Sequence, residues 1–175
     1  MRIYLPLAAS ELNNQQLYSQ FAWTGNQEFC RLWGIDPLDE EQAEDIAMTM
    51  AAMSCLETVG DSYPGRIVAA LDVDSGEINA SSNPGIFAVK KGFDWQRLVS
   101  LHVDGSEELA LCQQVRQAVI PKMAAAWCRG NFSGGEEQET PGWELWQQLA
   151  AEPLSWYDQS ELDYLRRSLA ENPAS

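Results

Sequence analysis

Short apolar runs and longer amphipathic stretches alternate along this chain. The apolar runs have the length of strands and are bounded by turn residues, so they predict strands at 2–7, 21–24, 66–74, 77–79, 85–90 and 99–103. Apolar residues that recur every three or four positions predict helices at 10–20, 26–33, 37–59, 106–120, 143–151 and 159–171. This order of elements predicts an α/β fold with a mixed β-sheet flanked by helices, and an α+β arrangement is the alternative.

The length of the chain predicts one globular domain over residues 1–175, because a chain of this size can bury a core of its own. Short turns link the strands in the middle of the chain, which indicates antiparallel pairing there. Asp36 and Pro37 give the clearest start signal for a helix, since Asp can cap and proline fits the first helical position. Residues 130–142 are rich in Gly and Glu and are predicted to form an exposed loop within the domain.

The composition is strongly acidic. Lys and Arg number 11 against 26 Asp and Glu, which gives a formal net charge of −15. A surface of this sign repels phosphate backbones and anionic membranes, so nucleic-acid binding and membrane binding are excluded as default roles. Solubility is the simpler interpretation of the charge. An acidic mimic of nucleic acid, which would occupy a nucleic-acid-binding protein, is a weaker alternative.

The cysteines lie far apart in the sequence, without the close pairs that bind zinc or perform redox chemistry: Cys30, Cys55, Cys112 and Cys128. The sequence shows no signal peptide and no apolar stretch long enough to span a membrane. We therefore expect a cytoplasmic protein with reduced, buried thiols.

His102 is the only histidine, which excludes every site that needs two. It precedes Asp104 by two positions at the end of a predicted strand, and Asp72 and Asp74 end another strand in the same way. Side chains two apart on a strand share a face, so the four residues would converge if the two strand ends were neighbours. Such a cluster could perform acid–base catalysis through His102, or hold a divalent cation on the oxygens of Asp72, Asp74 and Asp104.

A structural interpretation of the same residues is favoured. Strands commonly end in Asp-Gly, because Asp bonds its own backbone and Gly turns the chain, as in Asp104-Gly105. Ser106 then caps the next helix. No glycine-rich motif for a nucleotide or dinucleotide is present. No cofactor is predicted. The group that the carboxylates could hold is a divalent cation.

Large aromatic side chains gather in the last third of the chain. The candidates for contact with a partner protein are Trp143, Trp146, Trp156 and Tyr157. Aromatic clusters of this kind form part of a core, a homodimer seam or a protein-binding hot spot. The core or homodimer seam is the commoner case.

Three segments of the chain carry a resemblance to a known family. They are the opening Met1-Arg2-Ile3-Tyr4-Leu5-Pro6, the segment Leu101-His102-Val103-Asp104-Gly105, and Trp156-Tyr157-Asp158-Gln159 near the end. Together they resemble an uncharacterised family of actinobacterial proteins, small acidic cytosolic chains that begin MRxYxP and close on a Trp-Tyr-x-x-Gln-like motif. In this chain Ser160 follows Gln159, where the family pattern has an acidic residue. The resemblance implies a host group and a compartment, but no activity.

The leading hypothesis is a non-enzymatic domain that works through protein contacts or as a homodimer. The net charge, the clustered aromatics and the absence of a strong catalytic motif favour it. The alternative is a metal-dependent or acid–base hydrolase that uses Asp72, Asp74, His102 and Asp104. The order of the strands decides whether that cluster forms.

Overall fold

The computed structural model describes residues 1–57, 63–81, 85–118 and 142–171 of the chain. Seven strands form one sheet in the order β4-β5-β2-β1-β3-β6-β7. Their bounds are β1 (Arg2–Pro6), β2 (Phe21–Trp23), β3 (Ile67–Asp72), β4 (Ile78–Ala80), β5 (Ile86–Val89), β6 (Leu98–Val103) and β7 (Ser155–Tyr157). The helices are α1 (Gln27–Trp33), α2 (Glu40–Ser54), α3 (Leu109–Ala118), α5 (Trp143–Ala151) and α6 (Leu162–Glu171). Short 3-10 turns are η1 (Ala9–Asn13), η2 (Cys55–Glu57), η3 (Ser75–Glu77), η4 (Trp95–Arg97) and η5 (Gln159–Glu161).

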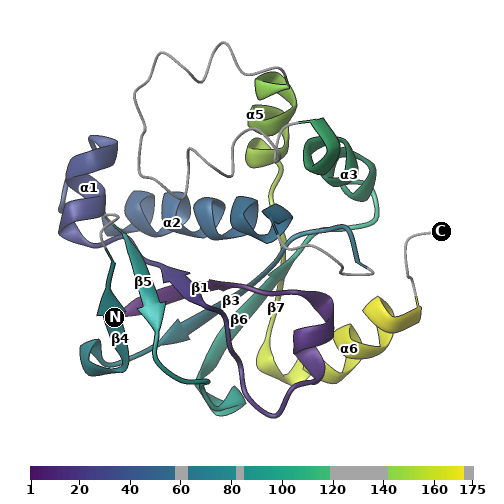
Figure 1. Ribbon diagram of the computed structural model, residues 1–175, viewed down its shortest axis with the longest axis horizontal. Coiled ribbons are helices and arrows are strands. Elements are labelled where there is room, and N and C mark those ends of the chain that lie inside the picture. The colour runs from purple at the N-terminus through teal and green to yellow at the C-terminus, as the bar shows by residue number, and fades with distance from the viewer. Residues whose placement is uncertain (58–62, 82–84, 119–141, 172–175) are drawn as a thin grey trace.

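The α/β fold, with a sheet flanked by helices, is confirmed (Figure 1). The sequence predicted a mixed sheet with parallel and antiparallel pairs. In the structure, every pair of described strands is antiparallel. The reason lies in the position of β1. Strands β2 and β3 run in the same direction and are joined through α1 and α2, as in a parallel fold. β1 lies between them, however, and pairs antiparallel with both.

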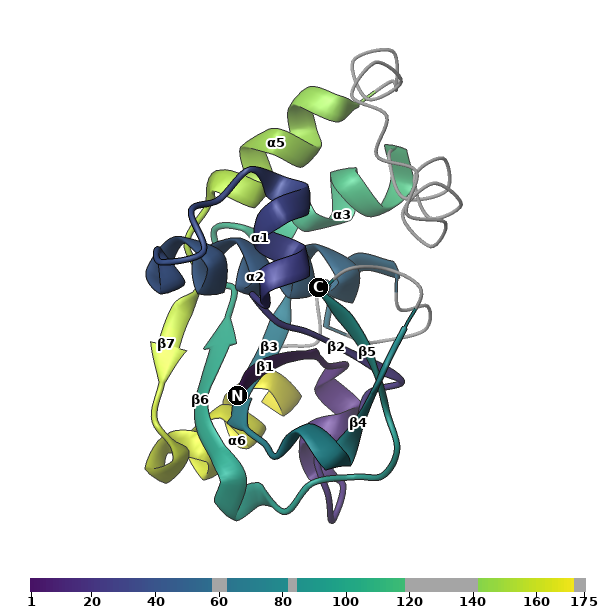
Figure 2. The same ribbon diagram turned by 90° about the vertical axis from the view of Figure 1, so that its left-hand side faces the viewer.

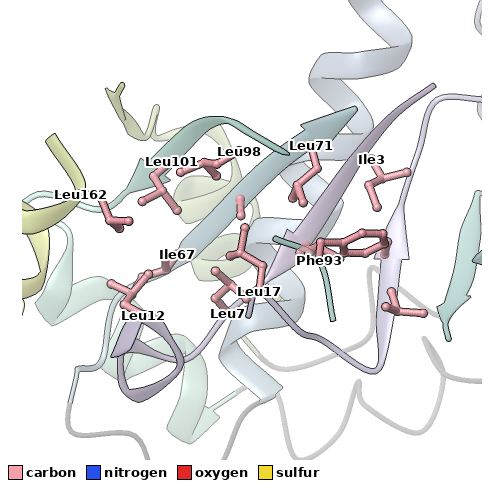
Figure 3. Close-up of a cluster of buried hydrophobic side chains, with 14 of the residues drawn as sticks. Ile3, Leu7, Leu12, Leu17, Ile67, Leu71, Phe93, Leu98, Leu101 and Leu162 are labelled. Atoms are coloured by element: carbon pink, nitrogen blue, oxygen red, sulfur yellow. The ribbon is translucent and has the colours of Figure 1, made fainter. Parts of the chain in front are cut away.

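Each face of the sheet carries its own core. Alternate residues of β3 point to opposite faces: Ile67, Ala69 and Leu71 to the side of α6, and Val68 and Ala70 to the side of α2. Figure 3 shows the α6-side cluster, whose side chains come from the strands, from α6 and from the segments between β1 and β2. Burial on both faces explains the nearly continuous apolar sequence of β3.

Helix α2 packs on β1, β2 and β3 and lies close to the sheet because the residues that face it are small. Ala43, Ala47 and Ala51 are spaced four apart and are all buried. The helix begins later than the sequence signal predicted. Asp36 accepts a bond from the Leu38 amide in a preceding turn, and Asp39 is the residue that caps α2.

A third apolar cluster joins helices α3 and α5 to the C-terminal end of α2 (Figure 2). Its buried members are Met53, Leu56, Cys112, Val115, Trp146 and Leu149. This cluster lies next to the start of β3 and the end of β6. Because α5 belongs to it, the cluster also positions the chain where it enters β7.

Two other elements differ from the prediction. The helix expected at 10–20 is the short turn η1, which reaches only Asn13. Strand β7 falls in a segment for which the sequence predicted no strand. Of the loop expected at 130–142, all but Gly142 lies outside the described residues.

Candidate functional site

The antiparallel pairing of β3 and β6 separates the candidate carboxylates. Val103 lies opposite Ile67 at the start of β3, so Asp104 lies at that end of the strand. Asp72 closes the other end of β3 and pairs with Arg2 on β1. A strand rises roughly 3.3 Å per residue, which puts the two ends of β3 about 16 Å apart. The structure therefore does not bring Asp72 and Asp74 together with Asp104.

Asp72 and Asp74 each form hydrogen bonds with another residue at their own end of the sheet. Both carboxylate oxygens of Asp72 accept bonds from the Arg2 guanidinium, at 2.9 and 3.1 Å. The bond from Arg2 lowers the pKa of the Asp72 carboxyl. Asp74 caps η3, and its backbone amide donates to the Glu77 carboxylate at 3.2 Å. Within the described part of the chain, no three His, Cys, Asp or Glu side chains are placed to hold a metal ion.

Asp104 forms a fully buried ion pair with Arg66, whose role the sequence did not reveal. The two side chains are 0 and 1 % exposed, and Nη2 of Arg66 lies 2.7 Å from Oδ1 of Asp104. Nε of Arg66 donates to the same carboxylate at 3.0 Å, and the Arg66 backbone amide donates to Oδ2 at 2.6 Å. Two planar groups joined by several bonds make a rigid connection between the start of β3 and the end of β6.

The same ion pair ties the helical cluster to the sheet. Arg66 also donates to the backbone oxygens of Leu149 in the last turn of α5, at 2.7 Å, and of Glu152 just after the helix, at 3.1 Å. The Tyr63 hydroxyl donates to the Asp104 backbone oxygen at 2.7 Å, and the Cys112 thiol lies 3.2 Å from Asp104 Oδ2. Burial and the neighbouring Asp104 carboxylate raise the pKa of Cys112. Cys112 is therefore a protonated thiol at neutral pH.

The hydrogen bond of the His102 ring goes to Ser100 and not to a carboxylate. His102 is half-buried on the α2 side of the sheet, in a row between Val68 on β3 and Trp156 on β7. Its Nε2 lies 2.9 Å from the Ser100 hydroxyl oxygen. Burial first, and then the charge of Arg2, lower the pKa of His102. The imidazole is therefore neutral at pH 7.

The lowered pKa of His102 predicts a loss of stability in mild acid. The unfolded chain, in which the pKa is close to 6.5, takes up the proton before the folded chain does. The contribution of His102 is thus fully present above pH 6.5 and is lost as the pH falls below that value. The free energy of unfolding, measured in urea on either side of this pH, should fall less for His102→Gln than for wild type. Equal losses in the two proteins would contradict the assignment.

The four aromatic residues predicted to contact a partner lie in different environments. Trp143 and Trp146 stack at 4.7 Å between ring centroids, and Trp146 is buried in the cluster with α3. Tyr157 is half-buried against the core on the α6 side. Trp156 is 59 % exposed.

Trp156 lies on an outer strand of the sheet. Among the described strands, β7 pairs only with β6 and is the last in the sheet order, as Figure 2 shows. One row of its backbone amides and carbonyls thus faces away from the sheet. The other outer strand, β4, exposes only the small side chains of Asn79 and Ala80. Of the two outer strands, β7 is thus the one that exposes a large apolar side chain.

The comparisons with known proteins reveal one relationship. The pattern of DUF6912, a family of unknown function, matches residues 1–165. No curated protein matches the chain, and no solved structure does. Among the described helices, none has the length and apolar character needed to cross a membrane. The expectation that the chain belongs to an uncharacterised family is thereby confirmed: it is a member of DUF6912.

Proposed function

We propose that this protein is a non-enzymatic protein-interaction domain whose docking surface is the outer edge of β7. We define the β7 edge as Ser155, Trp156 and Tyr157 together with His102, which lies opposite Trp156. The observation that carries the proposal is the exposed Trp156 on a strand with one side that no described strand pairs with.

The physical properties of this edge support docking. A tryptophan buries more apolar area than nearly any other side chain, and it loses few rotamers when a partner covers it. The open row of backbone groups can accept one more strand, which is a common mode of peptide recognition. The remaining aromatic candidates contribute to packing, so the docking role falls to Trp156.

The protein is proposed to act in the cytoplasm. The thiols of Cys30, Cys55 and Cys112 are free and buried, which supports a reducing compartment.

A selection from a displayed peptide library tests the docking role. Peptides selected on wild type should bind Trp156→Ala at least about 30-fold more weakly, because an interface tryptophan typically contributes 2 kcal/mol or more. Binding is measured by isothermal titration. The matched control is Tyr164→Ala. Tyr164 lies on α6 and is 58 % exposed, so this variant removes an aromatic ring of similar exposure.

The peptides should bind the Tyr164→Ala control as they bind wild type. Selected peptides that bind Trp156→Ala and wild type equally would place the interaction elsewhere and overturn the proposal.

A further inference from the structure

The segment that contains β7 is acidic. Residues 142–165 include five acidic side chains and no Lys or Arg: Glu144, Glu152, Asp158, Glu161 and Asp163. Asp158 and Glu161 follow β7 directly and are both exposed. A bond from the Ser160 backbone amide lowers the pKa of Asp158, so this carboxylate is charged at neutral pH.

Arg166 pairs with Asp163 at 3.2 Å, but within the described part of the chain no ion pair joins Asp158 or Glu161 to a cation. Arg66 is enclosed by its own ion pair. Arg166 on α6 donates to the Leu12 backbone oxygen at 2.7 Å, and its guanidinium lies 5.0 Å from the Trp95 ring centroid. His102, the imidazole beside Trp156, is neutral at pH 7. The β7 edge therefore combines an apolar anchor, open backbone groups and an acidic flank.

From this combination we infer that the partner docks as an extended, Lys- or Arg-rich segment that adds to the sheet along β7. This inference rests on the proposed function and specifies its ligand. The backbone of the segment would bond the open side of β7. Its apolar side chains would cover Trp156, and its cations would lie near Asp158 and Glu161.

A second copy of this chain fits the same edge less well. Two β7 strands related by a two-fold axis would pair antiparallel, which brings Asp158 of each copy toward Glu152, the acidic residue before β7, in the other. Each copy also carries a net charge of −15, so long-range repulsion opposes the pairing. The charges thus favour a basic partner over a homodimer.

The structure offers a test variant and a control with the same two changes, and the control also removes the ion pair of Glu77 with Arg97. Asp158 and Glu161 form a capping box after β7, and Asp74 and Glu77 form the same motif before β4, at the opposite edge of the sheet. Asn and Gln can take over the capping bonds while they remove the charges. The test variant is Asp158→Asn with Glu161→Gln, and the control is Asp74→Asn with Glu77→Gln.

The probes are three capped peptides in which Val alternates with Lys, Ser or Glu. In isothermal titration at low salt, the Lys–Val peptide should bind wild type about tenfold more tightly than the Ser–Val peptide, and the Glu–Val peptide should not bind. The test variant should weaken Lys–Val binding about fivefold, and the control variant should leave it unchanged. Added salt should reduce the difference between the Lys–Val and Ser–Val peptides.

The other outcomes separate the two proposals. If the Lys–Val and Ser–Val peptides bind equally and both lose binding in Trp156→Ala, the basic partner is overturned and the docking edge stands. If the test and control variants weaken Lys–Val binding equally, general charge attraction explains it and the basic partner is overturned. If Trp156→Ala weakens the binding of none of the three peptides and of no peptide selected from the library, the docking function is overturned as well. If sedimentation shows a dimer that Trp156→Ala dissociates, the partner is a second copy and not a basic segment.

Discussion

Replacing Asp104 with Ala is expected to lower the free energy of unfolding by about 3–5 kcal/mol, because the change leaves the Arg66 charge buried and unpaired. The two side chains are at most 1 % exposed, so water cannot take the place of the carboxylate without rearrangement. The bonds from Arg66 to the end of α5 depend on the same geometry. The loss is measured by urea unfolding at pH 7.

The control is Asp72→Ala, which removes the exposed ion pair with Arg2. The Asp72 side chain is 60 % exposed, and pairs in such settings typically contribute at most about 1 kcal/mol. A double variant, Arg66→Met with Asp104→Leu, tests the cause of the loss, because replacing both charges with apolar groups should recover most of it. If Asp104→Ala and Asp72→Ala cost the same, the buried pair does not hold the sheet to the helices as described.

Leu101→Ala is expected to cost about 2–5 kcal/mol, the second large effect. Leu101 is fully buried on the α6 side of β6, as Figure 3 shows, and lies opposite Ala69. The truncation removes apolar contacts and leaves a cavity that the small alanine partner cannot fill. Thermal and urea unfolding both report the change.

Leu38→Ala makes the same chemical change at a position that is 90 % exposed. It should alter the free energy of unfolding by no more than about 0.5 kcal/mol, as surface substitutions generally do. A small loss in Leu101→Ala, equal to that of Leu38→Ala, would mean that the α6 side of the sheet is not a packed core.

The sequence predicted the elements whose signals are local. The apolar run of β3 was visible as a strand because burial on both faces requires nearly every residue to be apolar. The helix predicted at 26–33 was found as α1, and it ends at Gly34, which adopts a φ of 66°. The start of α2 was wrongly predicted at Asp36, because Asp36 accepts from the Leu38 amide in a turn and Asp39 caps the helix.

Features that depend on distant parts of the chain could not be predicted. β7 is three residues long and exists through its pairing with β6, which lies more than 50 residues earlier in the sequence. The candidate cluster required β3 and β6 to end at the same side, and only the order and direction of the strands decide that. Arg66 was overlooked because arginine is rarely buried without a partner, and its partner Asp104 is 38 residues away. The exposed Trp156, by contrast, was among the aromatic residues chosen from the sequence.

The central claim is that a basic, extended segment binds along β7 and is anchored by Trp156. Two-dimensional amide NMR spectra recorded with increasing Lys–Val peptide test it most directly. We predict that the backbone amides of Ser155, Trp156 and Tyr157 and the Trp156 indole will shift, while the amides of β4 at the opposite edge stay unchanged. Shifts centred on β4, or spread over the acidic surface without a maximum at β7, would contradict the claim.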